Sequence, residues 1–448
     1  MSRSKLFSKN SKRTGNRSHG CRCSCICLPA AESNRYFHLL ERHPYLCSLF
    51  VCLLLNALYF GGEAYLAQNA VLLETLALLA AGAAVLWRLV RYQPQKKPAA
   101  VCVSVVYTLL VLAGAWCYHE ARHSGLWVLV GGCAVLSGLF WLTRKQYHNQ
   151  RRRVSLLLLG TSFLLKFFYV CYTPITRRQH DVGKFGDADN HAGYITYLLQ
   201  HHQLPDFDPR GHWQFYHPPL HHMISALWLW LSEHVFGISN AASQESLQTL
   251  SLFYAMAIVI TAYRILRHFR LEGIALYAPL AVVAFHPSFI LFSGSINNDA
   301  LSVVFILGAV LWTLKWYEKQ TWEGIVKIAL CIGLGMMTKL SAAMVAIPVA
   351  AVFLVVLVRQ LRQRNWRILG QLGGFAVICF PLGLWYPVRN LVRFGVPLTY
   401  VQEMPENSVQ YLGEQSFLSR ILDFSPHQVA SVFEQWVQRT GGSYNEYN

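Results

Sequence analysis

Long apolar stretches dominate this sequence, and they constrain its fold more than any other feature. A helix that crosses a bilayer needs about 20 predominantly apolar residues. Eleven candidate stretches fall at residues 43–60, 70–90, 99–118, 126–143, 154–174, 247–266, 273–294, 298–317, 324–338, 340–358 and 369–391. Only 14% of the 448 residues are charged, against about 25% in an ordinary soluble domain. The sequence therefore predicts an all-α integral membrane protein with about eleven transmembrane helices.

Basic clusters between these stretches predict how the chain is oriented. The net charge is +17, but the basic residues gather in short loops, as the positive-inside rule describes for cytoplasmic loops. We therefore expect the lipid bilayer, and not nucleic acid, as the partner of this charge. The basic tail, residues 1–42, is then cytoplasmic, and we interpret it as disordered. Residues 43–150 form a four-helix membrane extension without an assigned role, and residues 401–448 form a short extracytoplasmic segment.

One large polar loop, residues 175–246, is expected on the outer face. Its stretch "GDADNHAGYITYLLQHHQLPDFDPRGHWQFYHPPLHH" combines acids, histidines, prolines and aromatic residues. The following "MISALWLWLSEHVFG" is short and rich in tryptophan, which favours an interfacial helix over a span. The segments "SGSINNDA", "MMTKLS" and "WYPVRNLVRFGVPL" are expected on the same face. Four polar segments thus converge on one side of the membrane and predict a functional site there.

Acids and cations in these segments suggest a reaction at the membrane surface. Asp187 and Asp189 lie two residues apart, and such carboxylates act as general base, metal ligand or structural ion pair. Because no nucleotide-binding motif is present, we expect the substrate to come from the lipid, as a polyprenyl-phosphate sugar does. One carboxylate would deprotonate an acceptor hydroxyl. Lys339 and Arg389 would bind the departing phosphate.

The order of these motifs resembles that of a known family. "DADNHAGYITYLL", "LPDFD", "HPPLHH", "INNDA", "TK" and "RN…GVPL" follow one another as in GT-C superfamily glycosyltransferases, and the chain is similar to a bacterial, protein O-mannosyltransferase-like subgroup that uses polyprenyl-phosphate sugars. The resemblance covers about residues 154–400, and residues 151–400 are expected to form the catalytic core. It implies transfer of a hexose or similar sugar to a protein, glycan or lipid acceptor, with inversion and with an acid of the first outer loop as base.

The resemblance leaves the identity of that base open between two acids. Relatives often carry Asp–Glu where this chain has Asp187 followed by Ala188. The register against His191 favours Asp187, with Asp189 and His191 positioning the acceptor or the base. Substrate-binding residues are expected at Tyr194, Tyr216, His217, Asn298, Asp299, Lys339, Arg389 and Lys166.

Most of these residues also have a structural interpretation. His191 could pack beneath Tyr194, three residues further along a helix. Asn298 and Asp299 suit the N-terminus of a helix, where Asn and Asp are favoured caps. Lys339 and Arg389 could snorkel to the interface. Lys166 lies within an apolar stretch, where a lysine at the helix centre costs about 2.5–3.5 kcal/mol, so it should face the bundle interior, a wet cavity or the outer surface.

Cofactors, competing functions and location complete these expectations. The histidines match no zinc motif, so no cofactor is assigned, and a divalent cation (Mg or Mn) on Asp187 and Asp189 stays open. A lipid-linked sugar flippase or other transporter would need polar residues at the bilayer midplane, and a non-catalytic scaffold of the same fold is the other alternative. The resemblance to the bacterial subgroup favours a bacterial plasma membrane, with a cytoplasmic N-terminus and an extracytoplasmic site.

Overall fold

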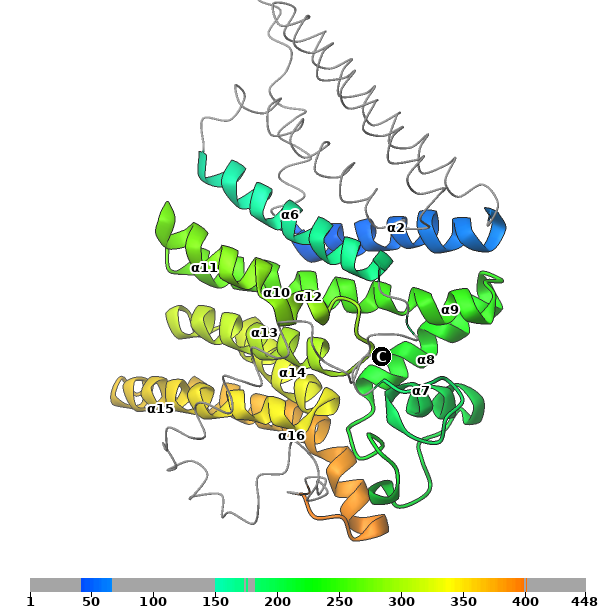
Figure 1. Cartoon of the computed structure of the whole chain (residues 1–448). Helices are drawn as coiled ribbons and strands as arrows, with labels where there is room; N and C mark the ends of the chain where they lie inside the picture. Colours follow the sequence, from blue (N-terminus) through cyan, green and yellow to red (C-terminus); the bar gives the residue numbers. More distant parts are fainter. Residues whose placement is uncertain (1–41, 67–149, 173–174, 176–181, 399, 401–448) are drawn as a thin grey trace, which may run out of the picture. The chain divides into compact units, whose positions relative to one another are not determined.

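A computed structural model describes residues 42–66, 150–172, 175, 182–398 and 400 (Figure 1). The chain divides into two units, Met1–Pro44 and Tyr45–Asn448, and the helical bundle belongs to the second. The spans expected at 70–90, 99–118 and 126–143 lie outside the described residues. So does the C-terminal segment 401–448, together with nearly all of the basic tail.

The described residues form helices and connecting loops, with no β-strand among them. In chain order the elements are α2 (Pro44–Leu66), α6 (Gln150–Tyr172), α7 (Asn190–His201), the 3₁₀ turn η2 (Pro209–Gly211), α8 (Leu220–Trp230), the π-helical turn η3 (Leu231–Val235), α9 (Asn240–Ser246), α10 (Gln248–His268), α11 (Ile274–Phe285), α12 (Pro287–Leu291), α13 (Asp299–Glu318), α14 (Trp322–Thr338), the 3₁₀ helix η4 (Leu340–Val345), α15 (Ala346–Arg362) and α16 (Arg367–Phe394). The expectation of an all-α protein is confirmed for this part of the chain.

Four helical stretches of the described residues are long and apolar enough to cross a membrane: Asn240–His268, Asp299–Glu318, Leu340–Arg362 and Arg367–Phe394. Shorter apolar helices cover Pro44–Ala57, Val154–Phe167 and Ile274–Phe285. Helices of this length and composition are those of an integral membrane protein. The number of eleven spans stays a prediction.

The span expected at residues 273–294 is not one helix, and this part of the prediction is wrong. α11 ends at Phe285, and α12 begins at Pro287 and is only 5 residues long. Proline forces the residue before it out of the helical conformation, and His286 accordingly has the extended angles φ −60°, ψ 127°. Its Nδ1 accepts a hydrogen bond from the Ser288 amide, so the side chain caps the helix that the proline begins.

Close helix packing aligns the elements that carry the site. α14 contacts both α13 and α16, and α13 also contacts α10 (Figure 1). Gly333 on α14 lies against α16, where an added Cβ would come within 2.8 Å of the Leu382 Cβ. Small residues of this kind let helix backbones approach closely. Because α13 and α14 are consecutive and run in opposite directions, Asp299 at the start of one and Lys339 after the end of the other lie at the same end of the pair.

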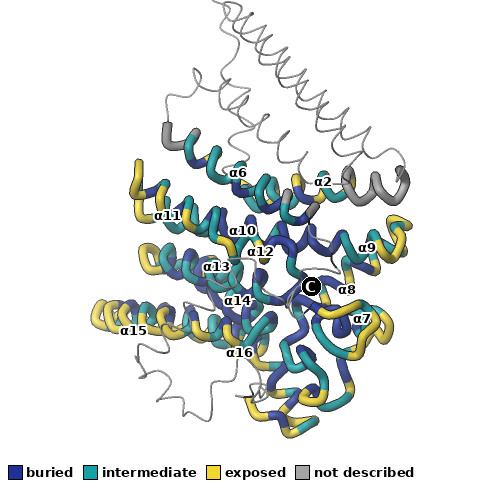
Figure 2. Tube along the Cα trace, in the orientation of Figure 1, coloured by how far each residue is buried: buried dark blue, intermediate teal, exposed yellow. Residues whose placement is uncertain are grey.

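The short helices α7 and α8 fall within the region expected as the first outer loop. α8 buries His221, His222 and Ser225, whereas Met223 and Leu227 are exposed. The polar side chains of α8 are thus buried, together with Ala226 and Leu229, and its exposed side chains are apolar, the reverse of the outer face of a helix in a soluble protein. Figure 2 shows the alternation of buried and exposed positions along α8, and it fits a helix whose outer face meets lipid.

Candidate functional site

A cavity of about 350 Å³ lies where the polar segments meet. Its walls come from α7, the loop at residues 213–218, the start of α13, the junction of α14 with η4, and the end of α16 with the residues that follow. Of the residues expected in the site, it is lined by His191, Tyr216, His217, Asp299 and Lys339. Segments up to 209 residues apart in the chain, from His191 to Tyr400, thus form one hollow.

Asp299 and Lys339 form an ion pair in the cavity wall. The Lys339 Nζ lies 2.5 Å from the Asp299 Oδ1, and both side chains are about one third exposed or less. Asp299 is the first residue of α13, where the positive end of the helix dipole favours a carboxylate. Lys339 has the extended angles φ −155°, ψ 127° between α14 and η4, which breaks the helix and leaves its side chain at the cavity. The pair places one ammonium group where an anionic ligand can reach it.

Asn298 and Asp299 stand at the N-terminus of α13, as expected, but the Asn298 side chain makes a tertiary contact in place of a capping hydrogen bond. Asn298 occupies the N-cap position without a side-chain capping bond. Its Nδ2 instead donates to the Thr338 carbonyl, at 3.1 Å. The Asn297 Oδ1 accepts from the Asp299 amide, at 3.2 Å. Asn298 thereby holds the end of α14 against the start of α13, beside the ion pair, and does not line the cavity itself.

Four histidines cluster at the cavity wall: His191 and His217 line the cavity, and His221 and His222 do not. The His191 Nδ1 lies 2.8 Å from the His222 Nε2. The His191 ring is stacked on His217, with centroids 5.9 Å apart, and meets His221 edge-on. Burial lowers the pKa of His191 and of His222 well below 6.5, and it lowers the pKa of His221 to about 4. These three imidazoles are therefore neutral near pH 7.

Tyr194 lies behind these histidines and does not line the cavity. Its ring stacks on His222, with centroids 4.3 Å apart, and on Phe215 at 4.5 Å. The expected packing of His191 beneath Tyr194 is thus replaced by packing through His222. The Tyr194 hydroxyl lies 3.3 Å from the Tyr386 hydroxyl, which donates to the Phe215 carbonyl at 2.9 Å. Burial raises the pKa of Tyr194 well above 10, so it stays a neutral phenol.

The two acids of the first polar loop lie outside the cavity lining. The Asp187 carboxylate accepts a hydrogen bond from the Lys184 amide, at 3.1 Å, and is exposed. Asp189 precedes α7, and its Oδ1 accepts from the Trp213 amide at 3.0 Å and lies 3.3 Å from the His212 Nδ1. Asp189 thus fastens α7 to the loop at residues 213–218. Among the described residues, the Asp187 side chain has no comparable tie to a distant segment.

A glycine places the turn that carries Asp187 against α7. A Cβ added to Gly193 would come within 2.6 Å of the Asp187 carbonyl oxygen. Only glycine permits this close approach of backbone to helix. Gly193 lies two residues after His191, which lines the cavity. The Asp187 turn is therefore packed on the same helical turn that forms one cavity wall.

Lys166 is buried at a distance from the cavity lining. Its Nζ donates to the Ser162 Oγ at 2.8 Å and to the Ala284 carbonyl at 2.7 Å. The break at His286 ends α11 just beyond Ala284, which leaves carbonyls of the last turn without a helical donor. Lys166 and Ser162, whose Oγ also donates to Ala284, satisfy this carbonyl. The side chain faces the bundle interior, as one of its expected placements requires.

Arg389 contacts the polar loop and does not line the cavity. Its Nη2 donates to the Pro205 carbonyl at 2.6 Å, and its Nη1 donates to the Asn390 Oδ1 at 3.0 Å. The Arg393 Nη1 lies 2.9 Å from the Asp206 Oδ1. The end of α16 is thus tied to residues 205–210 by two arginines of its own.

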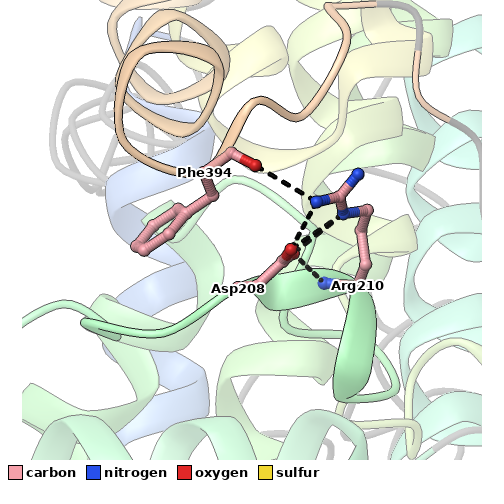
Figure 3. Close-up of polar contacts among 3 residues, drawn as sticks. All are labelled: Asp208, Arg210 and Phe394. Atoms are coloured by element: carbon pink, nitrogen blue, oxygen red, sulfur yellow. Dashed lines mark hydrogen bonds and ion pairs between the residues drawn. The ribbon is translucent and has the colours of Figure 1, made fainter.

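A third arginine, Arg210 of the polar loop, binds the end of α16 in return (Figure 3). The Arg210 Nη2 donates to the Phe394 carbonyl, at 3.1 Å, one of the carbonyls that a helix leaves unpaired at its C-terminus. The same guanidinium binds Asp208 and holds the pKa of that carboxyl below its usual value. We call these ties, made by Arg389, Arg393 and Arg210, the arginine clamp. The clamp ties the polar loop to the end of α16 that also carries the cavity residues Tyr386 and Asn390.

Several cavity residues are not predicted by the sequence. Tyr386 and Asn390 line the cavity from α16, and Trp213, Gln214 and Tyr400 line it from loops. Tyr386 and Asn390 lie in the stretch "WYPVRN", where only the arginine draws attention because of its charge. Within the described residues, no three His, Cys, Asp or Glu side chains lie close enough together to hold a metal ion. The residues present therefore offer no preformed metal centre in that part of the chain.

The fold and the site together define an all-helical membrane protein with a polar, ion-paired cavity at one end of its helices. Residues 217–385 match the model of the family described as dolichyl-phosphate-mannose-protein mannosyltransferase. The match supports a membrane glycosyltransferase that uses a lipid-linked sugar donor, and it confirms the resemblance to the mannosyltransferase-like family. No curated protein and no solved structure matches the chain. The matched range includes the ion pair of Asp299 and Lys339 but begins after Asp187 and His191.

Proposed function

We propose that the protein transfers a sugar, first of all mannose, from a polyprenyl phosphate to a hydroxyl group of an acceptor, within this cavity. The observation that carries the proposal is the Lys339 ammonium in the cavity wall, paired with Asp299 at 2.5 Å. An ammonium in a partly enclosed site stabilises phosphate far better than one in open water. The family match over residues 217–385 supplies the class of donor.

Lys339 would bind the phosphate through a second N–H group while it stays paired with Asp299. Before a donor binds, its charge is neutralised by Asp299, so the cation is not left uncompensated. A donor phosphodiester carries one negative charge, and the departing polyprenyl phosphate gains a second. The attraction to Lys339 therefore grows along the reaction, which is the condition for an interaction to accelerate it.

Asp187 is the base that we propose for this transfer. The acceptor oxygen forms a bond to the anomeric carbon while the bond from that carbon to the phosphate oxygen breaks; the hydroxyl proton passes to the base, and the phosphate keeps the electron pair. Attack opposite the leaving group gives inversion. Asp299 must give up Lys339, and Asp189 must give up Trp213, before either can accept a proton. Asp187 is held by one local amide and can turn toward a bound acceptor.

The position of the basic residues supports an extracytoplasmic site. α10, α13 and α15 end in turns that contain Arg267, Lys315, Arg359 and Arg362. The cavity is formed by the start of α13 and the end of α14, away from those turns. Under the positive-inside rule, the basic turns face the cytoplasm and the cavity faces the other side. A lipid donor would reach it laterally from the outer leaflet.

Purified protein in liposomes tests the proposal. The liposomes receive polyprenyl-phosphate mannose or other sugars, with a crude membrane extract as acceptor, and mass spectrometry follows the release of polyprenyl phosphate. We expect turnover of one donor by the wild-type protein and about 10²–10³-fold less by Lys339→Met. If the wild type leaves every donor intact but moves labelled donor between leaflets, the protein is a transporter and the proposal is wrong. EDTA treatment, followed by addition of Mg²⁺ or Mn²⁺, shows whether a divalent cation takes part.

A further inference from the structure

The hydrogen bond between His191 and His222 joins the cavity wall to a buried ring on another helix. His191 stands in the first turn of α7, lines the cavity and is 3% exposed, whereas His222 stands in α8 and is 0% exposed. Their 2.8 Å contact joins Nδ1 of His191 to Nε2 of His222. A neutral imidazole carries a proton on one nitrogen only. One of the two rings must therefore donate and the other must accept.

The surroundings keep both rings neutral. His217 and His221 lie beside His191, and the face of Tyr194 covers His222. Burial lowers the pKa of both rings, and the neighbouring histidines lower it further, as Lys339 does for His191. Within the described part of the chain, no carboxylate forms a hydrogen bond with either ring. A positive charge on the pair would thus have nothing to compensate it.

The second nitrogen of each ring decides which ring donates. The His222 Nδ1 is buried and has no hydrogen-bond partner among the described residues. If His191 donated, the proton of His222 would sit on this Nδ1 as a buried, unpaired N–H group. If His222 donates, the same atom is only an unpaired acceptor. Buried N–H groups without a partner are the rarer of the two in proteins, so the second arrangement is favoured.

We propose that His222 is a positioning residue that donates to His191 and thereby fixes His191 as the Nε2–H tautomer. His191 then presents a neutral N–H donor to the occupant of the cavity, and it acts as an electrophile toward a phosphate oxygen and not as a base. A preorganised neutral donor stabilises the charge that develops on the leaving phosphate without first having to lose a proton. This role rests on the proposed sugar transfer, but the tautomer itself does not.

The tautomer of His191 can be determined without an activity assay. Protein labelled with ¹⁵N-histidine in lipid nanodiscs gives separate NMR signals for protonated and bare ring nitrogens, and His191→Asn identifies the signals of His191. We expect Nε2 of His191 to be protonated and Nδ1 to be bare. His222→Leu should leave a mixture of tautomers, since nothing then holds Nδ1. His221→Gln is the matched control, because His221 is equally buried on the same helix but makes no hydrogen bond with His191, and it should leave the tautomer of His191 unchanged.

Kinetics then test the consequence for the reaction. His222→Leu should lower kcat by roughly tenfold to a hundredfold, the range found when the outer partners of ligating histidines are removed, and should change KM less. His222→Gln, whose amide can still donate to His191, should retain most of the activity. The wild type should show no loss of activity from His191 between pH 6 and 8, because its pKa lies well below 6.5.

The outcomes separate the two proposals. If the wild type shows Nδ1 of His191 protonated, the inference about His222 is overturned whether or not sugar is transferred. If the wild type and His222→Leu have the same tautomer and the same kcat, it is overturned as well. If the tautomer is as expected but no donor is consumed, the proposed function fails while the role of His222 stands. Should His222→Leu not fold, the spectra of the wild type and His222→Gln still decide the question.

Discussion

Asp187 and Asp299 belong to segments that meet at the same cavity, but their carboxylates have different partners. Asp299 lines the cavity and is bound by the ammonium of Lys339. Asp187 lies outside the lining and accepts one hydrogen bond from a nearby amide. The first arrangement neutralises and orients a cation; the second leaves a carboxylate able to move. We infer from this difference that Asp299, inside the cavity, is better suited to orienting Lys339, and that Asp187, beside the cavity, is better suited to accepting a proton.

The largest effect should come from removing the proposed base. Asp187→Asn keeps the size and the hydrogen bond of the side chain, but it cannot accept the acceptor's proton. We expect kcat to fall by about 10²–10⁴-fold, the usual contribution of general base catalysis, with KM nearly unchanged. Steady-state kinetics with the consumed donor measure this.

Asp189→Asn is the matched control for that change. Its amide oxygen can still accept from the Trp213 amide, so kcat should fall much less. If instead Asp299→Asn abolishes turnover while Asp187→Asn does not, the comparison is reversed, and the cavity acid is the base.

Breaking the ion pair should have the next largest effect. Lys339→Met removes the cation and leaves Asp299 without its partner, so we expect kcat/KM to fall by about 10²–10³-fold, as when one charge-stabilising donor is lost from an active site. Lys339→Arg should recover part of this loss.

The double variant Lys339→Met/Asp299→Asn separates stability from function. It removes both charges, so its thermal unfolding should return toward that of the wild type while its activity stays low. Activity that recovers together with stability would mean that Lys339 has only a structural role.

A smaller effect should follow from displacing the turn that carries Asp187. The Cβ of Gly193→Ala would meet the Asp187 carbonyl oxygen at 2.6 Å, so the turn must shift. Overpacking of this kind costs about 1–3 kcal/mol, and we expect kcat to fall with it. Thermal unfolding and donor kinetics measure the two effects.

Gly211→Ala is the control for that substitution. A Cβ at Gly211 would have nothing within 4 Å, and it should leave both measurements unchanged. Equal behaviour of the two alanine variants would show that the position of the turn is irrelevant to catalysis.

The smallest effect is expected for Asp206, an acid that has a cationic partner but does not line the cavity. Arg393 binds Asp206 in the arginine clamp, and these side chains are 50% and 61% exposed. Exposed ion pairs contribute about 0–1 kcal/mol. Arg393→Gln should therefore change the unfolding temperature only slightly, and less at high salt than at low salt. If Arg393→Gln lowered kcat/KM as much as Lys339→Met does, the clamp, and not the cavity, would control activity.

The helices, and the polar side chains available at their ends, could be predicted from the amino-acid sequence alone. The apolar stretches at 247–266, 298–317, 324–338 and 369–391 each correspond to a helix in the structure, and the stretch 340–358 corresponds to η4 followed by α15, because burying an apolar face and pairing the backbone internally are requirements that each segment meets locally. The break at His286 was visible in principle from the proline that comes after it. The polar motifs between the helices likewise named His191, His217, Asp299 and Lys339 before their contacts were known.

Which of these residues meet depends on how the helices and the loop pack against one another. Lys339 pairs with Asp299 across 40 positions of the chain, and Arg389 binds the Pro205 carbonyl across 184. His222 was one of nine histidines in the polar loop until its bond to His191 distinguished it. Such pairings depend on how closely α13, α14 and α16 approach and on how the loop folds back over them. Spacing along a sequence predicts neighbours three or four residues apart on a helix, but it carries no comparable signal for side chains brought together by packing.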